Sequence, residues 1–243
     1  ANDCRTGYSE SPAPHDNTIL WSLPISGTEH EFVSPVIVDG RVYYASEEDE
    51  IAYCLDAATG SEIWRYENIG DAIDDAIHVV DGRAYIASDS VWCLDALTGS
   101  RIWAFRDGDP FGYSGPPVPW QEYVFVCARP GPVYCLNIET GEEIWETSCD
   151  YSTVSSMTVC NESLLVPTHG SGIFALDVND GSVIWENTDG GGCYWDSSPV
   201  VFEGTIYICN EQGPARAINA ATGVTEWISS PTGGRTRQGD PLI

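Results

Sequence analysis

Residues 53–64 read Tyr-Cys-Leu-Asp-Ala-Ala-Thr-Gly-Ser-Glu-Ile-Trp, and this pattern decides the fold because it recurs five times along the chain. Each copy has an Asp or Asn, a Gly four residues later and a Trp eight residues later. The Asx residues are Asp56, Asp95, Asn137, Asp177 and Asn219; the glycines are Gly60, Gly99, Gly141, Gly181 and Gly223; the tryptophans are Trp64, Trp103, Trp145, Trp185 and Trp227. Successive copies lie 39, 42, 40 and 42 residues apart. A period of about 40 residues indicates a solenoid, an array or a propeller.

Short β-strands are predicted for the rest of each period. Before each Asx lies an apolar stretch that a polar or glycine-containing turn splits into two runs. Asp39-Gly40 and Asp81-Gly82 give the strongest hairpin signals, because both central residues of a type I′ turn need positive φ. A strand ending at the Asx and a strand carrying the Trp complete four strands per period. No segment has a sustained apolar repeat of 3.6 residues, so no helix is expected.

The turn and the Trp both have local physical reasons. An Asx side chain accepts hydrogen bonds from backbone N–H groups just ahead of it, and the Gly takes the left-handed conformation that returns the chain antiparallel. The Trp buries a large ring at the same phase of every repeat. We therefore predict an all-β fold, a β-propeller of four-stranded antiparallel blades, rather than a β-sandwich whose hairpins happen to look alike. In this fold the repeated Trp and Gly are structural.

The repeat resembles the quinoprotein-type, or PQQ-like, propeller repeat, whose signature is Tyr-x-Leu-Asp-Ala-x-Thr-Gly-x-x-x-Trp. Residues 53–64 and 92–103 match that signature nearly position for position, and the resemblance covers about residues 30–242. It implies the blade type. The same repeat occurs in dehydrogenases, in outer-membrane assembly lipoproteins and in sensor or surface domains, so the resemblance leaves the activity open.

Both ends of the chain carry parts of a further blade. Residues 1–18 are predicted to form an N-terminal linker or mature terminus, and residues 19–243 the propeller domain. Trp21 suits the last strand of a blade although no Asx lies eight residues before it, and Asp240-Pro241-Leu242-Ile243 suits a first strand. Two interpretations remain: a ring of six sites with one degenerate blade, or part of a chain with seven or eight blades. We favour the second.

The chain is strongly acidic. It has 37 Asp and Glu against 10 basic residues, all of them Arg, for a formal net charge of −27. Repulsion between so many like charges destabilises a compact fold in dilute salt. At 1 M salt the screening length is only about 3 Å, so this repulsion is largely removed. This composition is typical of a halophilic, haloarchaeal protein. A low-salt acidic protein that binds Ca²⁺ or a basic partner would explain the acids but not the absence of Lys.

The same composition limits which partners and which cellular location are expected. Phosphate contacts need clustered Lys and Arg, so no nucleic acid is expected as a partner. No run of 18 apolar residues occurs, so no transmembrane segment is expected either. Ala1-Asn2-Asp3-Cys4 before a polar stretch is typical of a processed, mature N-terminus. We predict an extracellular or cell-surface protein, with Cys4 as a candidate lipid anchor whose fourth position argues against that role.

The nine cysteines fall into two groups. Five occupy repeat positions that hold Ala or Val in other copies, and we expect them to be small buried residues: Cys54, Cys93, Cys127, Cys135 and Cys209. Cys149 and Cys193 both fall in loops between blades, and a Cys149–Cys193 disulfide would suit an extracytoplasmic protein. Because there is no Cys-x-x-Cys and the four histidines are scattered, we predict no metal site.

The sequence holds no recognisable catalytic motif. Quinoprotein dehydrogenases, which the repeat resembles, hold PQQ between a Trp and a pair of adjacent cysteines, with Ca²⁺ bound by Glu and Asn and an Asp as base. No two cysteines are adjacent here, so no active-site residue carries over. Phosphate-binding and nucleophile-elbow motifs are absent as well. We expect no catalytic residue and no cofactor; PQQ and Ca²⁺ enter only if the chain is part of such a dehydrogenase.

The loops between blades carry the remaining candidates, because in a propeller they emerge on one face around the central channel. The aromatic candidates are Tyr113, Tyr151, Tyr194 and Trp195, and the charged ones are Asp74, Asp75, Asp196, Arg235 and Arg237. Aromatic rings with a few convergent charges suit a recognition surface. The structural alternative is that the rings cover the blade ends and the acids hold water and salt.

The sequence therefore favours a non-enzymatic extracytoplasmic propeller that acts as a binding, scaffold or surface-assembly module in a high-salt organism. Its expected partner is a protein, a surface polymer or copies of itself. The alternative is a fragment of a PQQ-dependent quinoprotein dehydrogenase. A sensor domain of a larger membrane protein is a third hypothesis that the sequence does not separate from the first.

Overall fold

The protein is all-β in the part of the chain that its structure, a computed structural model, describes. The described residues are 18–23, 34–46, 49–70, 73, 77–108, 112–129, 131–149, 156–168, 172–189, 198–209 and 214–229. They contain twenty strands and no helix, arranged as five four-stranded antiparallel sheets. The prediction of four antiparallel strands per repeat is confirmed.

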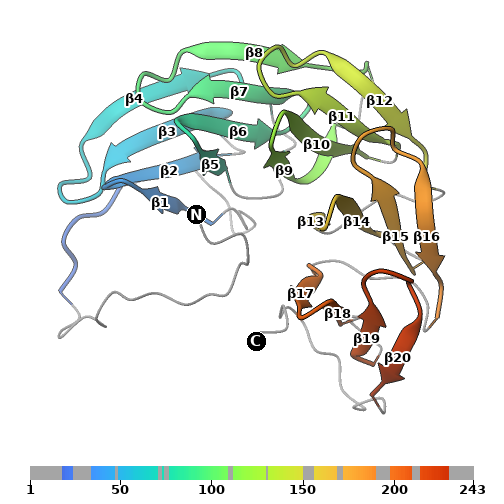
Figure 1. The fold of residues 1–243 in the computed structure, drawn as a ribbon. Helices are drawn as coiled ribbons and strands as arrows, with labels where there is room; N and C mark the ends of the chain where they lie inside the picture. The colour runs from blue at the N-terminus through green and yellow to red at the C-terminus, as the bar shows by residue number, and fades with distance from the viewer. Residues whose placement is uncertain are drawn as a thin grey trace. The chain divides into compact units, whose positions relative to one another are not determined.

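Each sheet uses four consecutive strands, so every sheet corresponds to one sequence repeat (Figure 1). The strands are β1 (Val36–Val38), β2 (Arg41–Ser46), β3 (Ile51–Asp56) and β4 (Glu62–Glu67); β5 (His78–Val80), β6 (Arg83–Ala87), β7 (Val91–Asp95) and β8 (Arg101–Phe105); β9 (Tyr113–Trp120), β10 (Tyr123–Ala128), β11 (Val133–Asn137) and β12 (Glu143–Thr147); β13 (Thr158–Cys160), β14 (Ser163–Thr168), β15 (Gly172–Asp177) and β16 (Val183–Asn187); β17 (Val200–Phe202), β18 (Thr205–Ile208), β19 (Arg216–Asn219) and β20 (Thr225–Ile228).

The chain divides into two compact units. The N-terminal unit holds the sheets β1–β4 and β5–β8 and most of the sheet β9–β12. The C-terminal unit includes residues 130–133 and the chain from Trp145 on, with the sheets β13–β16 and β17–β20. Each unit has its own apolar core. Tyr85, Trp103 and Leu136 belong to one core of the N-terminal unit, and Leu165 and Ile218 to the core of the C-terminal unit.

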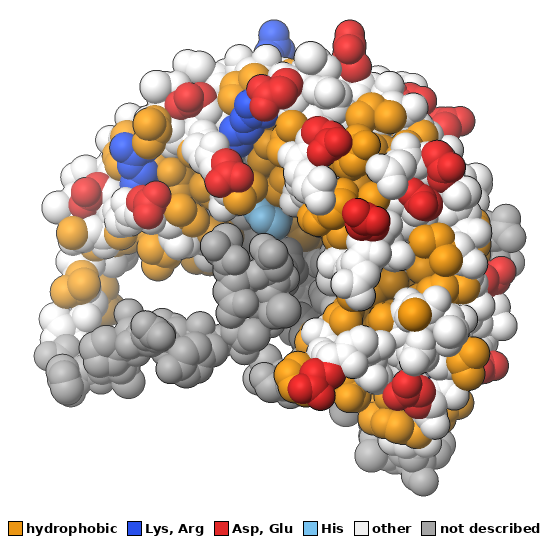
Figure 2. Space-filling view, viewed as in Figure 1, with side chains coloured by type: hydrophobic (Ala, Val, Ile, Leu, Met, Phe, Trp, Pro, Cys, Tyr) orange, Lys and Arg blue, Asp and Glu red, His pale blue; other side chains and the backbone are white. Residues whose placement is uncertain are grey.

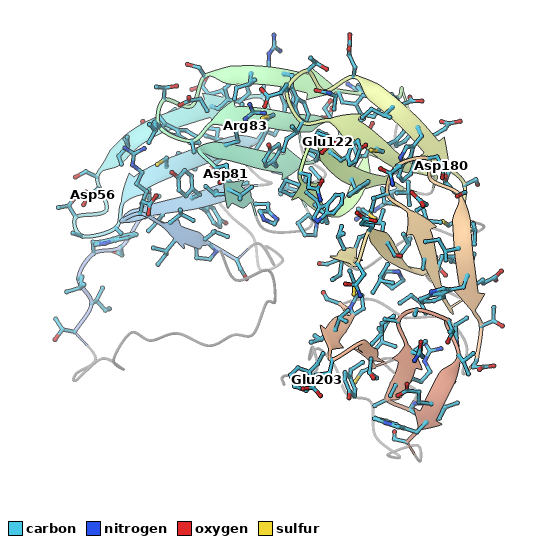
Figure 3. All side chains as sticks on the ribbon, in the orientation of Figure 1. Asp56, Asp81, Arg83, Glu122, Asp180 and Glu203 are labelled. Atoms are coloured by element: carbon cyan, nitrogen blue, oxygen red, sulfur yellow. The ribbon has the colours of Figure 1, made fainter. Side chains whose placement is uncertain are left out.

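The Asx turn closes the last hairpin of each sheet. In the first sheet the Asp56 carboxylate accepts hydrogen bonds from Ala58 N (3.1 Å), Thr59 N (2.8 Å) and Thr59 Oγ1 (2.8 Å). Gly60 follows with φ of 70°. Figure 3 labels Asp56 in this turn. Because the side chain satisfies three donors at once, the turn is fixed by its own residues.

A hydrogen bond ties the Asx turn to the first hairpin of the same sheet. The tip of that hairpin, Asp39-Gly40, has φ values of 49° and 72°, as the type I′ prediction requires. Ala57 N donates to Gly40 O over 2.9 Å. The equivalent bonds run from Ala96 to Gly82, from Ile138 to Glu122, from Val178 to Glu162 and from Ala220 to Gly204. Both turns therefore lie at one end of every sheet.

Each Asx turn lies under the Trp of the repeat before it. The indole Nε1 donates to the carbonyl of the residue after the Asx: Trp21 to Ala57 (2.9 Å), Trp64 to Ala96 (3.0 Å), Trp103 to Ile138 (2.9 Å), Trp145 to Val178 (3.0 Å) and Trp185 to Ala220 (3.1 Å). The ring covers the turn glycine so closely that a Cβ there would lie 2.5–2.7 Å from its nearest atom. We call this arrangement the indole seat. Its Gly must lack a side chain for two reasons, positive φ and space.

Within the ranges that the structure describes, no helix has the length and apolar character needed to cross a bilayer.

Candidate functional site

The predicted rim residues fall almost entirely outside the described residues. This holds for Tyr151, Tyr194, Trp195, Asp74, Asp75, Asp196, Arg235 and Arg237. The structure therefore describes one of the predicted rim residues, Tyr113.

Tyr113 is not at a binding surface, which corrects its assignment to the rim. It lies in β9 and is 1% exposed. Its ring packs against Phe105 and Tyr134, with centroids 6.1 and 6.5 Å away. Its hydroxyl accepts a hydrogen bond from Asp107 N at 3.0 Å, and burial raises its pKa. The position after a loop suggested exposure, but a large ring at the start of a strand gains more by filling the core.

The described part of the rim is a junction between β6–β7, the loop after β4 and the entry to β9. The side chains of Ser88 and Trp92 both donate to the carbonyl of Ile69, the latter over 3.0 Å. Tyr113 N donates to Ser88 O over 2.8 Å. Three segments far apart in the sequence thus share one polar centre. Ile69 N, Ser88 N and Tyr113 N each donate to a backbone carbonyl, so these groups are held by hydrogen bonds.

Charged side chains stand at the outer surface of this junction. Asp89 and Arg106 approach to 3.4 Å, with side chains 31% and 54% exposed. Only the backbone of Arg129 lies near this pair, because its N donates to Gly112 O over 2.8 Å and Gly112 approaches the backbone of Asp89; its part-buried guanidinium lies 3.5 Å from Ser114 Oγ. We call Asp89 and Arg106 the rim cluster. An exposed ion pair of this kind contributes little to stability.

The rim cluster was missed because the sequence prediction considered only loops that join one blade to the next. Ser88-Asp89-Ser90 joins two strands within a blade, and a polar Ser-Asp-Ser between two apolar runs was the available signal. Elsewhere, acidic side chains are spread over the face that Figure 2 shows, with few arginines among them. Exposed Arg side chains are thus uncommon among the described residues on that face.

The repeat tryptophans are not all alike. Trp64, Trp103, Trp145 and Trp185 are 6–9% exposed, whereas Trp227 is 47% exposed. Trp227 is thus the one of the five repeat tryptophans whose ring is about half exposed.

The cysteines offer no reactive thiol among the buried repeat positions. Burial raises the pKa of Cys93 and of Cys135 to about 12, so both thiols stay protonated near neutrality. Cys149 is 4% exposed, and Cys193 lies outside the described residues, so the predicted Cys149–Cys193 disulfide stays a prediction. Across the described ranges no three His, Cys, Asp or Glu side chains gather as metal ligands would.

Consecutive four-stranded antiparallel sheets, one for each sequence repeat of this type, define the β-propeller class with a quinoprotein-type repeat. Solved β-propeller structures are similar to the fold of this chain. BamB from Moraxella catarrhalis superposes with a TM-score of 0.67 at 19% identity, over 81% of this chain and 63% of that one. A quinohemoprotein alcohol dehydrogenase from Pseudomonas putida HK5 gives 0.66 at 18% identity, over 81% of this chain and 41% of that one.

The family is shown by sequence. The family model described as outer membrane protein assembly factor BamB matches residues 11–111 and 87–242, and the chain belongs to this family. Tetrathionate hydrolase of Acidithiobacillus ferrooxidans is 25% identical over 210 residues, which are 86% of this chain and 39% of that protein. The chain thus spans well under half the length of this relative. The likeness to the solved structures establishes the fold alone.

Proposed function

We propose that this chain is a non-enzymatic extracytoplasmic binding module that serves as a platform for protein assembly at a cell envelope. Membership of a family described as an assembly factor supports the proposal. The observation that carries it is the division of roles within the second repeat. Its Asp95 and Gly99 form an indole seat under Trp64, whereas the rim cluster at the opposite ends of the strands takes no part in that seat.

The partner that suits the rim cluster is a protein surface with an acidic group. Arg106 is more than half exposed and its pairing with Asp89 is at 3.4 Å, so an incoming carboxylate can compete for it. Gly70 leaves room for the Asp89 carboxylate, since a Cβ at Gly70 would lie 2.4 Å from its oxygen. The cluster therefore presents a positioned pair of opposite charges, which favours orientation of a partner more than raw affinity.

The high-salt habitat and the surface location belong to the same proposal. A net charge of −27 without Lys supports them, because an acidic surface stays hydrated and soluble when salt screens its repulsion.

Site-specific photocrosslinking tests the binding role. A photoreactive amino acid at position 107, which is exposed beside Arg106, should give crosslinks to envelope proteins in molar salt. The same amino acid at position 65 is the matched control, because Arg65 is 48% exposed and paired with Glu62 on the outer strand β4. We expect crosslinks from position 107 that disappear when Arg106 is replaced by Glu. Equal crosslinking from positions 107 and 65 would contradict the proposal.

The dehydrogenase alternative makes a different prediction. It requires PQQ and Ca²⁺, and the described residues do not present a donor set that suits the metal. Equilibrium dialysis with PQQ and Ca²⁺ separates the two functions: tight binding together with dye-linked alcohol oxidation would favour the enzyme over the binding module.

A further inference from the structure

The hairpin between β9 and β10 differs from its counterparts in the other four described sheets. In every sheet two residues flank the tip of this hairpin and pair with each other. The pairs are Val38 and Arg41, Val80 and Arg83, Trp120 and Tyr123, Cys160 and Ser163, and Phe202 and Thr205. Of the five described sheets, the third has two aromatic rings at this place. Since the other four hairpins form without such a pair, the turn itself does not require the rings.

The two rings are stacked and fixed from inside the sheet. Trp120 and Tyr123 have centroids 6.3 Å apart and planes at 18°. Tyr123 packs in turn on Phe125, with centroids 6.0 Å apart, and Phe125 is 0% exposed. The stack therefore runs from the hairpin tip to a buried ring. Such a preorganised surface lowers the cost of ordering side chains when a ligand binds.

An amide and a carboxylate lie between these rings in the chain. Trp120 and Tyr123 are partly exposed, and Gln121 and Glu122 are exposed. Ile138 N donates to Glu122 O over 2.9 Å, which ties the tip to the Asx turn of the same sheet; Figure 3 labels Glu122. The tip thus presents aromatic rings and polar side chains from a backbone that is held by a hydrogen bond.

This combination suits a neutral sugar. A pyranose has an apolar face of C–H groups that lies flat on an aromatic ring, and hydroxyl groups around its edge. The Gln121 amide donates and accepts hydrogen bonds and the Glu122 carboxylate accepts them, so both bind hydroxyls. Glu122 and the net charge of −27 disfavour an anionic ligand. A cation also binds aromatic faces, but molar salt largely screens its attraction to an exposed carboxylate.

We propose that the tip formed by Trp120, Gln121, Glu122 and Tyr123 is a binding platform for a neutral hexose unit of an oligosaccharide or polysaccharide. Trp120 provides the stacking face, and Gln121 and Glu122 bind hydroxyl groups. The tip lies at the Asx-turn end of its sheet, whereas the rim cluster lies at the opposite strand ends of the second sheet. This inference therefore does not depend on the proposed function.

The test uses the full chain in molar KCl and three neutral probes: cellohexaose, maltohexaose and α-1,6-linked mannohexaose. Indole N–H signals are followed by ¹H–¹⁵N NMR, and the Trp120 signal is identified by its loss in Trp120→Phe. We expect at least one probe to shift the Trp120 signal with a Kd of about 1 mM.

Variants are compared by saturation transfer from the protein to the C–H protons of the probe that binds. Trp120→Ala should weaken binding at least about tenfold, because the stacking face is lost. Gln121→Ala should weaken it at least about threefold, because a hydrogen bond to a hydroxyl is lost. Since Gln121 is exposed, its variant tests the site even where Trp120→Ala disturbs the hairpin.

Phe202→Ala is the matched control. Phe202 occupies the same place in the fifth sheet and is 48% exposed, but it pairs with Thr205 instead of an aromatic residue. We expect this variant to bind the probe as the wild type does. No shift of the Trp120 signal by any probe at about 10 mM would overturn the proposal, as would equal losses of binding in Phe202→Ala and Trp120→Ala. A shift caused by arginine amide but by none of the sugars would overturn it too, because the tip would then be a cation site.

Discussion

Single glycines and carboxylates set the geometry of each repeat. Gly141 has φ of 71°, and a Cβ there would lie 2.6 Å from the Trp103 ring. Gly40 has nearly the same φ, 72°, but nothing within 4 Å of such a Cβ. Comparing an Ala substitution at Gly141 with one at Gly40 therefore separates the effect of backbone strain from that of steric overlap. The turn glycine serves both the hairpin and the packing of one sheet on the next.

Gly141→Ala should lower the free energy of unfolding by about 3 kcal/mol, because left-handed strain adds to overlap with the Trp103 ring. Gly40→Ala, which meets open space, should cost only about 1–2 kcal/mol. Urea unfolding followed by near-ultraviolet circular dichroism in molar salt measures both. Equal losses in the two variants would show that the ring does not press on the turn.

The turn aspartates make stability depend on pH. Hydrogen bonds from Thr98 lower the pKa of Asp95, and the corresponding bonds from Thr59 lower that of Asp56. Since the folded state favours the ionised form, this contribution is complete above the unfolded pKa of about 3.9 and is lost as the pH falls through the lowered folded value.

Asp95→Asn should fold, because Asn137 and Asn219 already hold the equivalent turns with Oδ1 bonds to backbone N–H groups. The variant should lose less stability than the wild type between about pH 5 and pH 3. Unfolding midpoints across that range provide the comparison. An identical pH dependence in the two proteins would count against the turn carboxylate as a source of it.

At the scale of the element, a recurrent β-bulge precedes the repeat Trp in four of the five described sheets. Cys93 pairs with Trp103 and Leu94 with Arg101, so Ile102 is the extra residue, and the same shift recurs in the first, fourth and fifth sheets. A bulge places two residues against one and lets the side chains on either side of it face differently. Glu62 and Ile63 are exposed and Trp64 is buried for this reason.

Ile102→Glu should change the free energy of unfolding by less than about 0.5 kcal/mol. Ile102 is 42% exposed, and Glu226 already occupies the same place before Trp227. Deleting Ile102 should instead abolish cooperative unfolding, because the strand would slip and expose Trp103. Thermal melts of the two variants test the bulge, and a loss above about 2 kcal/mol in Ile102→Glu would argue against it.

The repeat elements could be predicted because they are local. Asp56, Thr59 and Gly60 form a turn through hydrogen bonds among themselves, and Asp39-Gly40 forms a hairpin turn because both residues adopt positive φ. The spacing of these residues in the sequence was therefore enough to predict both turns. The candidate site could not be predicted from the sequence, because the burial of a side chain depends on contacts with residues far away in the chain. Tyr113 follows a loop and yet fills the core, while Asp89 and Arg106 meet only when two hairpins are brought together. Likewise, no spacing distinguishes Trp227 from Trp185.

At the scale of the whole molecule, the net charge predicts how stability depends on salt concentration. With a net charge of −27, repulsion between carboxylates opposes the compact state until salt screens it. We expect the thermal midpoint to rise steadily between about 0.1 M and 3 M KCl, and the near-ultraviolet signal of the tryptophans to fade on dialysis into dilute buffer. Scans in KCl and in an uncharged osmolyte separate screening from general stabilisation. A midpoint independent of salt would refute the halophilic interpretation.

The central claim is that one indole per repeat locks each sheet onto the next turn, and that Trp227 is the exception. Hydrogen–deuterium exchange of the indole N–H groups in the native protein tests it most directly, with signals assigned by single Trp→Phe variants. We predict that Trp64, Trp103, Trp145 and Trp185 exchange at least about tenfold more slowly than Trp227, because their hydrogens are bonded to carbonyls and buried. Equally fast exchange of all five would contradict the account.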